Sequence, residues 1–135
     1  MSKSKHPALD IFAAIYSFKH QFNRLAQDPN LSVRAHANAE PTHTSLTLEV
    51  FKNIKGDTLC VIEIPHILRI EDSGDSLVVL KQSRLPAITL VSDGTSTVEC
   101  RQELPTYFDD DINGETISSD VIAAEAYEQL EPFLI

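Results

Sequence analysis

The sequence predicts an α+β fold: an N-terminal amphipathic helix, then an antiparallel β-meander of about five to seven strands, then a C-terminal helix. The observation behind this order is that the hydrophobic period changes twice along the chain. Apolar residues recur with a helical period before residue 28, with a strand period between residues 31 and 101, and with a helical period again near the C-terminus. With 135 residues, 42% of them hydrophobic, we expect a single domain over 1–135 with one packed core.

The first helix is predicted over residues 8–28. Pro7 suits its first turn, and Pro29 prevents it from continuing. Residues 8–16 are apolar almost all round, so the start of the helix must be covered on several sides. The sheet and the C-terminal helix would cover it, or else a second copy of the protein would. Spacings of four, three, four and three residues define its main apolar face, which consists of Ile11, Ile15, Phe18, Phe22 and Leu25.

The sheet is predicted over residues 31–101. Connections of only a few residues cannot cross back to form a parallel pair, so the strands are expected to be antiparallel. Pro65 and His66 interrupt the stretch 58–71, which is either two strands or one strand bent at a bulge. Asp93-Gly94 is typical of a two-residue hairpin turn. The strand candidates are residues 31–36, 45–50, 58–64, 67–71, 76–80, 87–91 and 96–101.

Residues 103–135 are predicted to form an acidic loop followed by a helix. This segment has nine carboxylates and no Lys, Arg or His, whereas residues 1–102 have eleven basic and eleven acidic residues, so the net charge of −9 arises in the last quarter. Ser118 or Ser119 is expected to cap a helix that runs to about Glu131. Its predicted apolar stripe is Ala123, Tyr127, Leu130 and Leu134.

Residues 109–120 partly match a calcium-binding loop, with Asp, Asp, Asn and Gly at positions 1, 3, 5 and 6 and Asp at position 12. Three features argue against calcium. Pro105 precedes the loop where a helix would be needed, Thr116 occupies a hydrophobic position, and Asp120 is shorter than the usual Glu. We therefore expect a solvated loop and a helix cap, and calcium binding stays an open question.

No pattern in the sequence indicates catalysis. The chain has no G-x-S-x-G or Ser-x-x-Lys motif and no Gly-rich phosphate loop. His36 and His43 could face each other across a hairpin, but no third ligand with metal-like spacing accompanies them. Cys60 and Cys100 are expected to be buried thiols in a reducing compartment. These observations predict a cytoplasmic, non-enzymatic protein without a cofactor or a metal site.

Nucleic acids and membranes are not expected as direct partners. The basic residues are scattered singly and matched by acids up to residue 102, so no cationic face is predicted for phosphate binding. No apolar run approaches the length that crosses a bilayer.

The acidic segment instead favours a protein-binding module. Carboxylates can steer a basic partner, and two aromatic residues beside them have the composition of an interface. We expect a small acidic inhibitor, of the immunity, antitoxin or phage anti-defence type, that engages a basic surface, for example of a nucleic-acid-handling protein. The alternatives are a homodimeric secretion-type chaperone or adaptor, and a ligand-binding or enzymatic α+β domain without a local motif. The identity of the partner and the choice between monomer and homodimer are left open. The predicted partner-binding residues are Tyr107, Phe108, Asp109, Asp110, Asp111, Glu115, Glu125 and Glu128.

Overall fold

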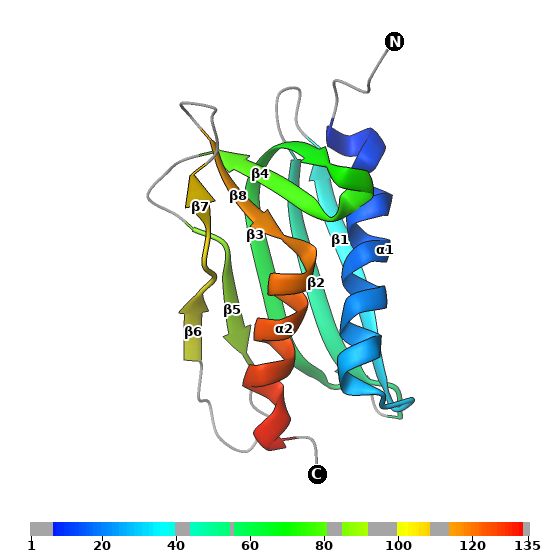
Figure 1. The fold of residues 1–135 in the computed structure, drawn as a ribbon. Helices are drawn as coiled ribbons and strands as arrows, with labels where there is room; N and C mark the ends of the chain where they lie inside the picture. The colour runs from blue at the N-terminus through cyan, green and yellow to red at the C-terminus, as the bar shows by residue number, and fades with distance from the viewer. Residues whose placement is uncertain are drawn as a thin grey trace.

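The computed structural model describes residues 7–39, 44–54, 56–80, 85–91, 100–108 and 114–133. Within these ranges, two helices lie on one face of an eight-stranded antiparallel sheet (Figure 1), which confirms the predicted α+β class and element order. The elements are α1 (Pro7–Ala26), β1 (Leu31–Ala39), β2 (Thr44–Lys52), β3 (Thr58–Glu71), the 3-10 turn η1 (Asp72–Gly74), β4 (Ser76–Leu80), β5 (Ala87–Leu90), β6 (Cys100–Glu103), β7 (Tyr107–Phe108), β8 (Gly114–Ser118), α2 (Ser119–Leu130) and the 3-10 turn η2 (Glu131–Phe133).

The long strand β3 organises the sheet. β2 pairs along one side of it, whereas β5 and β4 share the other side, β5 opposite residues 60–63 and β4 opposite residues 67–71. The pairing with β2 shifts register around Pro65 and His66, and His66 has a positive φ of 52°. Residues 58–71 are therefore one strand with a bulge, which resolves the alternative that the sequence left open.

The sequence predicted a loop before α2, whereas the described residues of this segment include two strands that were not predicted, β7 and β8. β8 pairs with β4, and β7 pairs with β8, so this segment extends the sheet. The antiparallel sheet is confirmed, but not every strand pairs with the next one in sequence, because β5 returns to β3 and leaves β4 to pair with β8. The β3–β5 and β4–β8 pairs join segments far apart in the sequence, which local hydrophobic periodicity cannot reveal. The predicted strand 96–101 and the Asp93-Gly94 turn lie outside the described residues, except that β6 begins at Cys100.

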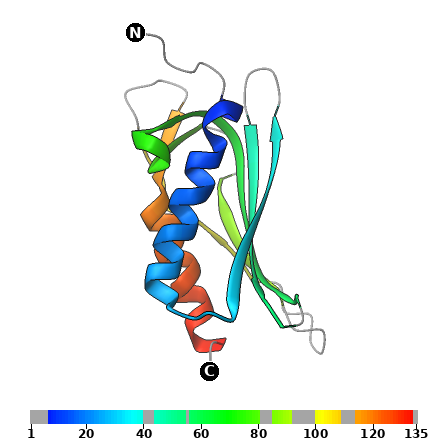
Figure 2. The ribbon, with the colours of Figure 1, turned by 90° about the vertical axis from the view of Figure 1, so that its right-hand side faces the viewer.

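The helices and the sheet form two layers (Figure 2), and the hydrophobic core consists of buried residues from both. Ile11, Phe18 and Phe22 of α1 are at most 4% exposed, and Ile15 is half-buried, as the helical spacing predicted. Leu25 departs from this prediction, because 43% of it is exposed. The core residues of α2 are Ile122, Ala123, Ala126 and Leu130, while Tyr127 is half-buried beside them.

The turn η1 joins the two helices to the sheet. Its three residues all have positive φ, and its Gly74 lies against the backbone of Ala13 in α1. The Ser17 hydroxyl of α1 donates a hydrogen bond to Asp75 Oδ1 at 2.6 Å. The hydroxyl of Ser119, the first residue of α2, donates to the carbonyl of Gly74 at 2.7 Å, and its N–H donates to the carbonyl of Asp75 at 2.8 Å. This turn therefore fixes where α2 begins.

Within the described ranges, neither helix combines the length and the apolar character needed to cross a membrane.

Candidate functional site

The carboxylates of α2 and η2 lie on the side of the helix that faces away from the core. The core residues of α2 occupy its sheet side, and a helix of 3.6 residues per turn then places the acidic positions opposite them. From Ser119 to Phe133 the chain has no Lys, Arg or His. We call this surface the acidic face of α2. It consists of Asp120, Glu128 and Glu131, which are exposed, and Glu125, which is half-buried.

The acidic face is held by few contacts within the protein. Asp120 Oδ1 accepts a hydrogen bond from the Ser118 hydroxyl at 2.6 Å. Glu131 Oε2 accepts one from the Tyr127 hydroxyl at 3.4 Å. The charge of Glu131 raises the pKa of the Tyr127 hydroxyl, with smaller contributions from partial desolvation and from this hydrogen bond. Ser118 is the N-cap residue, as predicted, but its side chain contacts Asp120 and makes no hydrogen bond to the helix backbone.

Two of these carboxylates lie at the end of α2 where negative charge is unfavourable. The C-terminus of a helix carries a partial negative charge, so a basic residue in the last turn is stabilising and an acidic one is destabilising by about 0.3–1 kcal/mol. The last turn of α2 has no basic residue, and it contains Glu128, with Glu131 directly after it. Helix stability therefore does not account for these two carboxylates.

A shallow groove between α1 and α2 borders the acidic face. The two helices run in the same direction (Figure 1), and the groove follows their solvent side. Leu25 and Ala124 give it an apolar part, while Arg24 and Asp120 are its charged residues. The groove is lined by Gln21, Arg24, Leu25, Gln27, Asp120 and Ala124.

The structure divides the residues that the sequence predicted as one site. Glu115 lies in β8 opposite Val79, whose side chain is in the core, so Glu115 is on the helix-bearing side of the sheet. Tyr107 pairs with Thr116, the next residue along β8, and therefore faces the opposite side; it is 57% exposed. Phe108 occupies the register position beside Glu115. Tyr107 and Glu115, which the sequence analysis assigned to one site, therefore lie on opposite faces of the sheet.

Glu125 and Glu128 are brought together on α2, as predicted. Glu125 lies one turn before Gln129, whose amide donates a hydrogen bond to the Gln102 side chain of β6, so Glu125 faces the β6 side of the helix layer. Asp109, Asp110 and Asp111 lie outside the described residues. The sequence-based site omitted Asp120 and Glu131. The position of both at the ends of a base-free helix was the signal that could have identified them.

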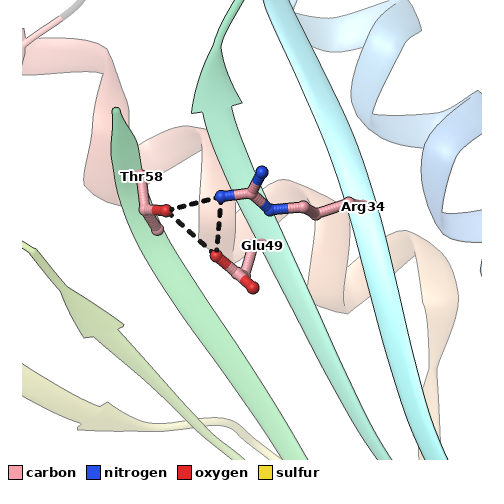
Figure 3. Close-up of polar contacts among 3 residues, drawn as sticks. All are labelled: Arg34, Glu49 and Thr58. Carbon is pink, nitrogen blue, oxygen red and sulfur yellow. Dashed lines mark hydrogen bonds and ion pairs between the residues drawn. The ribbon is translucent and has the colours of Figure 1, made fainter. Parts of the chain in front are cut away.

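On the opposite face of the sheet, Arg34 and Glu49 are paired with each other within the protein. Arg34 of β1 reaches across β2, where its Nη2 lies 3.3 Å from Glu49 Oε1 and 3.2 Å from the Thr58 hydroxyl of β3 (Figure 3). Thr58 in turn donates to Glu49 at 2.9 Å. The Arg34 guanidinium also lies 4.4 Å from the centre of the Phe51 ring. The charges of Arg34 and Glu49 are therefore satisfied by contacts within the protein.

The other ion pair found in the described part of the chain joins Arg69 and Glu71 at 3.0 Å on β3. Neither ion pair involves the acidic face of α2. The negative field of that face is therefore not cancelled by described neighbours at ion-pair distance.

The position of Asp120 does not suit the twelfth ligand of a calcium-binding loop. Gly114–Ser118 is an extended strand, which carries the chain about 13 Å away from its start before Asp120 is reached. A calcium loop must instead turn back so that its twelfth residue meets the first. Positions 109–113 lie outside the described residues, as does His43 of the predicted histidine pair. Within the residues that are described, no three His, Cys, Asp or Glu side chains are grouped as metal ligands.

The two cysteines are too far apart to bond to each other. Cys60 of β3 and Cys100 of β6 pair with Leu90 of β5 from its two sides. Their Cα atoms are thus two strand spacings apart, roughly 9.5 Å, beyond the reach of about 7 Å for a disulfide. Cys60 is a fully buried thiol, and burial raises its pKa to about 12.

Comparison of the chain with protein-family models, with curated proteins and with solved structures found no match.

Proposed function

We propose that this protein is a non-enzymatic binding module that engages a basic surface of another protein through the acidic face of α2. The observation that carries the proposal is the placement of Glu125, Glu128 and Glu131 on a base-free helix, where described neighbours do not neutralise them and the helix dipole opposes two of them. Charged residues that lower the stability of a helix and form no ion pair in their own chain are typical of a functional surface.

The spacing of the carboxylates suits a partner that binds a polyanion. Residues three apart on a helix are separated by about 4.5 Å along its axis. One strand of duplex DNA presents a phosphate about every 3.4 Å. The carboxylates along α2 are thus spaced about as closely as the phosphates that a cationic nucleic-acid-binding groove contacts. This similarity supports a role as an inhibitor that occupies the binding groove of a nucleic-acid-handling protein.

The groove beside α2 supplies the apolar contact that such an interface needs. Stable interfaces combine a desolvated apolar centre with a charged rim, and the rim charges mainly accelerate association. Leu25 and Ala124 are accessible in the groove directly beside Asp120. The proposed interface is therefore the outer side of the two-helix layer, with the α1–α2 groove at its centre and the acidic face of α2 along one border.

A pull-down from the source cell with matched variants tests the proposal. We expect the wild type to recover a protein with a basic surface and Glu125→Lys/Glu128→Lys to lose it. The single variants Asp57→Lys, at an exposed position in the β2–β3 connection, and Glu128→Lys change the net charge equally; the first should keep the partner and the second should weaken its recovery. Recovery of the same partner by the α2 variant, with its helix content unchanged, would contradict the proposal.

A further inference from the structure

The outer edge of β1 and the adjacent side of α1 form a second surface, unrelated to the acidic face. β1 pairs with β2 in nine consecutive positions without a bulge, and no described strand pairs with its other edge. On α1, Phe12 is 77% exposed and Tyr16 is 71% exposed. The Tyr16 ring stacks on His20, with ring centres 6.3 Å apart. Figure 2 looks onto this side of the molecule, where α1 and β1 lie side by side.

The two aromatic side chains point away from α2. Gln21 and Leu25 line the α1–α2 groove, and at 100° per residue Phe12 lies 180° around the helix from Gln21 and Tyr16 about 140° from it. The start of α1, which the sequence predicted to need cover on several sides, packs on the core through Ile11 and against η1 at Ala13, whereas the side that carries Phe12 and Tyr16 stays exposed. The uncovered side is the one next to the edge of β1.

Edge strands normally carry features that prevent them from pairing with other chains, such as Pro, Lys, a bulge or an inward-pointing charge. β1 has none of these, because its sequence is LSVRAHANA and its ladder is regular. Its only permanent charge is that of Arg34, which is held across β2 by Glu49 and Thr58, away from the edge (Figure 3). The edge is therefore a regular, nearly uncharged template for another strand.

We infer that the occupant of this surface is a second copy of the chain, whose β1 pairs antiparallel with the first about a two-fold axis at Ala35. This register is the one that overlaps all nine residues of both strands. On the helix side it places Leu31 opposite Ala39, Val33 opposite Ala37, and Ala35 opposite itself. On the other side it places Ser32 opposite Asn38 and Arg34 opposite His36, so that no carboxylate meets another.

The same axis brings the two α1 helices together on one face of a continuous sheet. They run antiparallel to each other, with Phe12 and Tyr16 of each copy facing the other above the small residues of the paired strands. Ala37 and Ala39 are exposed in one chain and leave room for these rings. Four largely exposed aromatic rings would bury roughly 500 Å², a substantial share of the about 1,200 Å² that a stable interface buries. The acidic faces of α2 stay outside this interface.

Cysteine cross-linking tests the register. In the proposed dimer the two Ala35 Cα atoms are opposite each other, at about 4.5–5.5 Å, within disulfide range. Ala35→Cys should therefore form a disulfide-linked dimer under mild oxidation. Ala39→Cys should not, because residue 39 faces residue 31 of the partner and lies about 26 Å from its own copy. The wild type, which retains Cys60 and Cys100, is the background control. Equal cross-linking of both variants, or none at Ala35, would overturn the proposed register.

Solution mass measurements test the surface itself. We expect the wild type to have twice the monomer mass at tens of micromolar, and Phe12→Ser/Tyr16→Ser to raise the dimer dissociation constant about tenfold or more. Ala37→Lys, which adds a charge at an exposed edge position, should do the same. Ile54→Ser removes an 81% exposed apolar side chain in the β2–β3 connection and should leave the dimer intact. A monomeric wild type, or a dimer unaffected by both interface variants, would overturn the inference.

Discussion

The open face of the sheet and the acidic face of α2 both carry charged side chains, but they differ in how the protein itself satisfies them. On the sheet, Arg34, Glu49 and Thr58 contact one another within 3.3 Å, and Phe51 lies under the guanidinium. On α2, Glu125 and Glu128 have no ion pair with a described residue, and Glu128 opposes the helix dipole. A charged surface therefore indicates a binding partner when the charges on it have no oppositely charged neighbour in their own chain.

The largest expected effect comes from breaking the turn that positions α2. A Cβ on Gly74 would lie 2.4 Å from the carbonyl carbon and oxygen of Ala13, and Gly74 has a φ of 95° that other residues rarely adopt. We expect Gly74→Ala to lower the free energy of unfolding by about 3 kcal/mol or more. Chemical denaturation measures this change. Gly56→Ala is a matched control with positive φ but open space around its Cβ, and it should lose only about 1 kcal/mol. Equal losses would show that close packing of η1 on α1 is not what holds the turn.

A smaller loss of stability is expected for a change on the sheet face, where Arg34 and Glu49 are paired. Arg34→Ala removes an exposed ion pair, a hydrogen bond to Thr58 and the contact with Phe51, so we expect it to lower the free energy of unfolding by about 1 kcal/mol. Because those charges are satisfied internally, partner recovery in the pull-down should not change. Loss of the partner with this variant would move the binding surface to the sheet.

The smallest expected effect is a gain in the free energy of unfolding. Glu128→Gln removes a carboxylate from the last turn of α2, where the dipole disfavours it, and helix propensity hardly changes. We expect the free energy of unfolding to rise by about 0.5 kcal/mol while affinity for the basic partner falls. Thermal denaturation in low salt measures the first change. A stabilised variant with unchanged affinity would show that Glu128 is not part of the interface.

Much of the fold follows from local sequence patterns, and the remainder depends on long-range pairing. The spacing from Ile11 to Phe22 predicted α1, and alternation predicted the strands from Leu31 to Leu90. β8 was missed because Gly114–Ser118 is short, begins with Gly and ends in Ser118, which with Ser119 resembles a helix cap. Its partner β4 lies more than thirty residues earlier, so only the tertiary structure shows the pair.

The candidate site was also predictable only where a local sequence pattern defines it. The run of glutamates on a helical pattern identified Glu125 and Glu128 as outward-facing. That Tyr107 and Glu115 lie on opposite sides of the sheet follows from the β7–β8 register, which no local pattern gives. That Glu125 and Glu128 make no ion pair with a described residue could be seen only once the side chains had been placed in three dimensions.

The most direct test of the central claim is the association rate constant of the recovered partner as a function of ionic strength. If the acidic face of α2 steers a basic surface, the rate constant should fall by about tenfold between 50 and 300 mM salt. The Glu125→Lys/Glu128→Lys variant should associate slowly at both concentrations. A wild-type rate constant that is independent of salt, equal to that of the variant, would contradict the account.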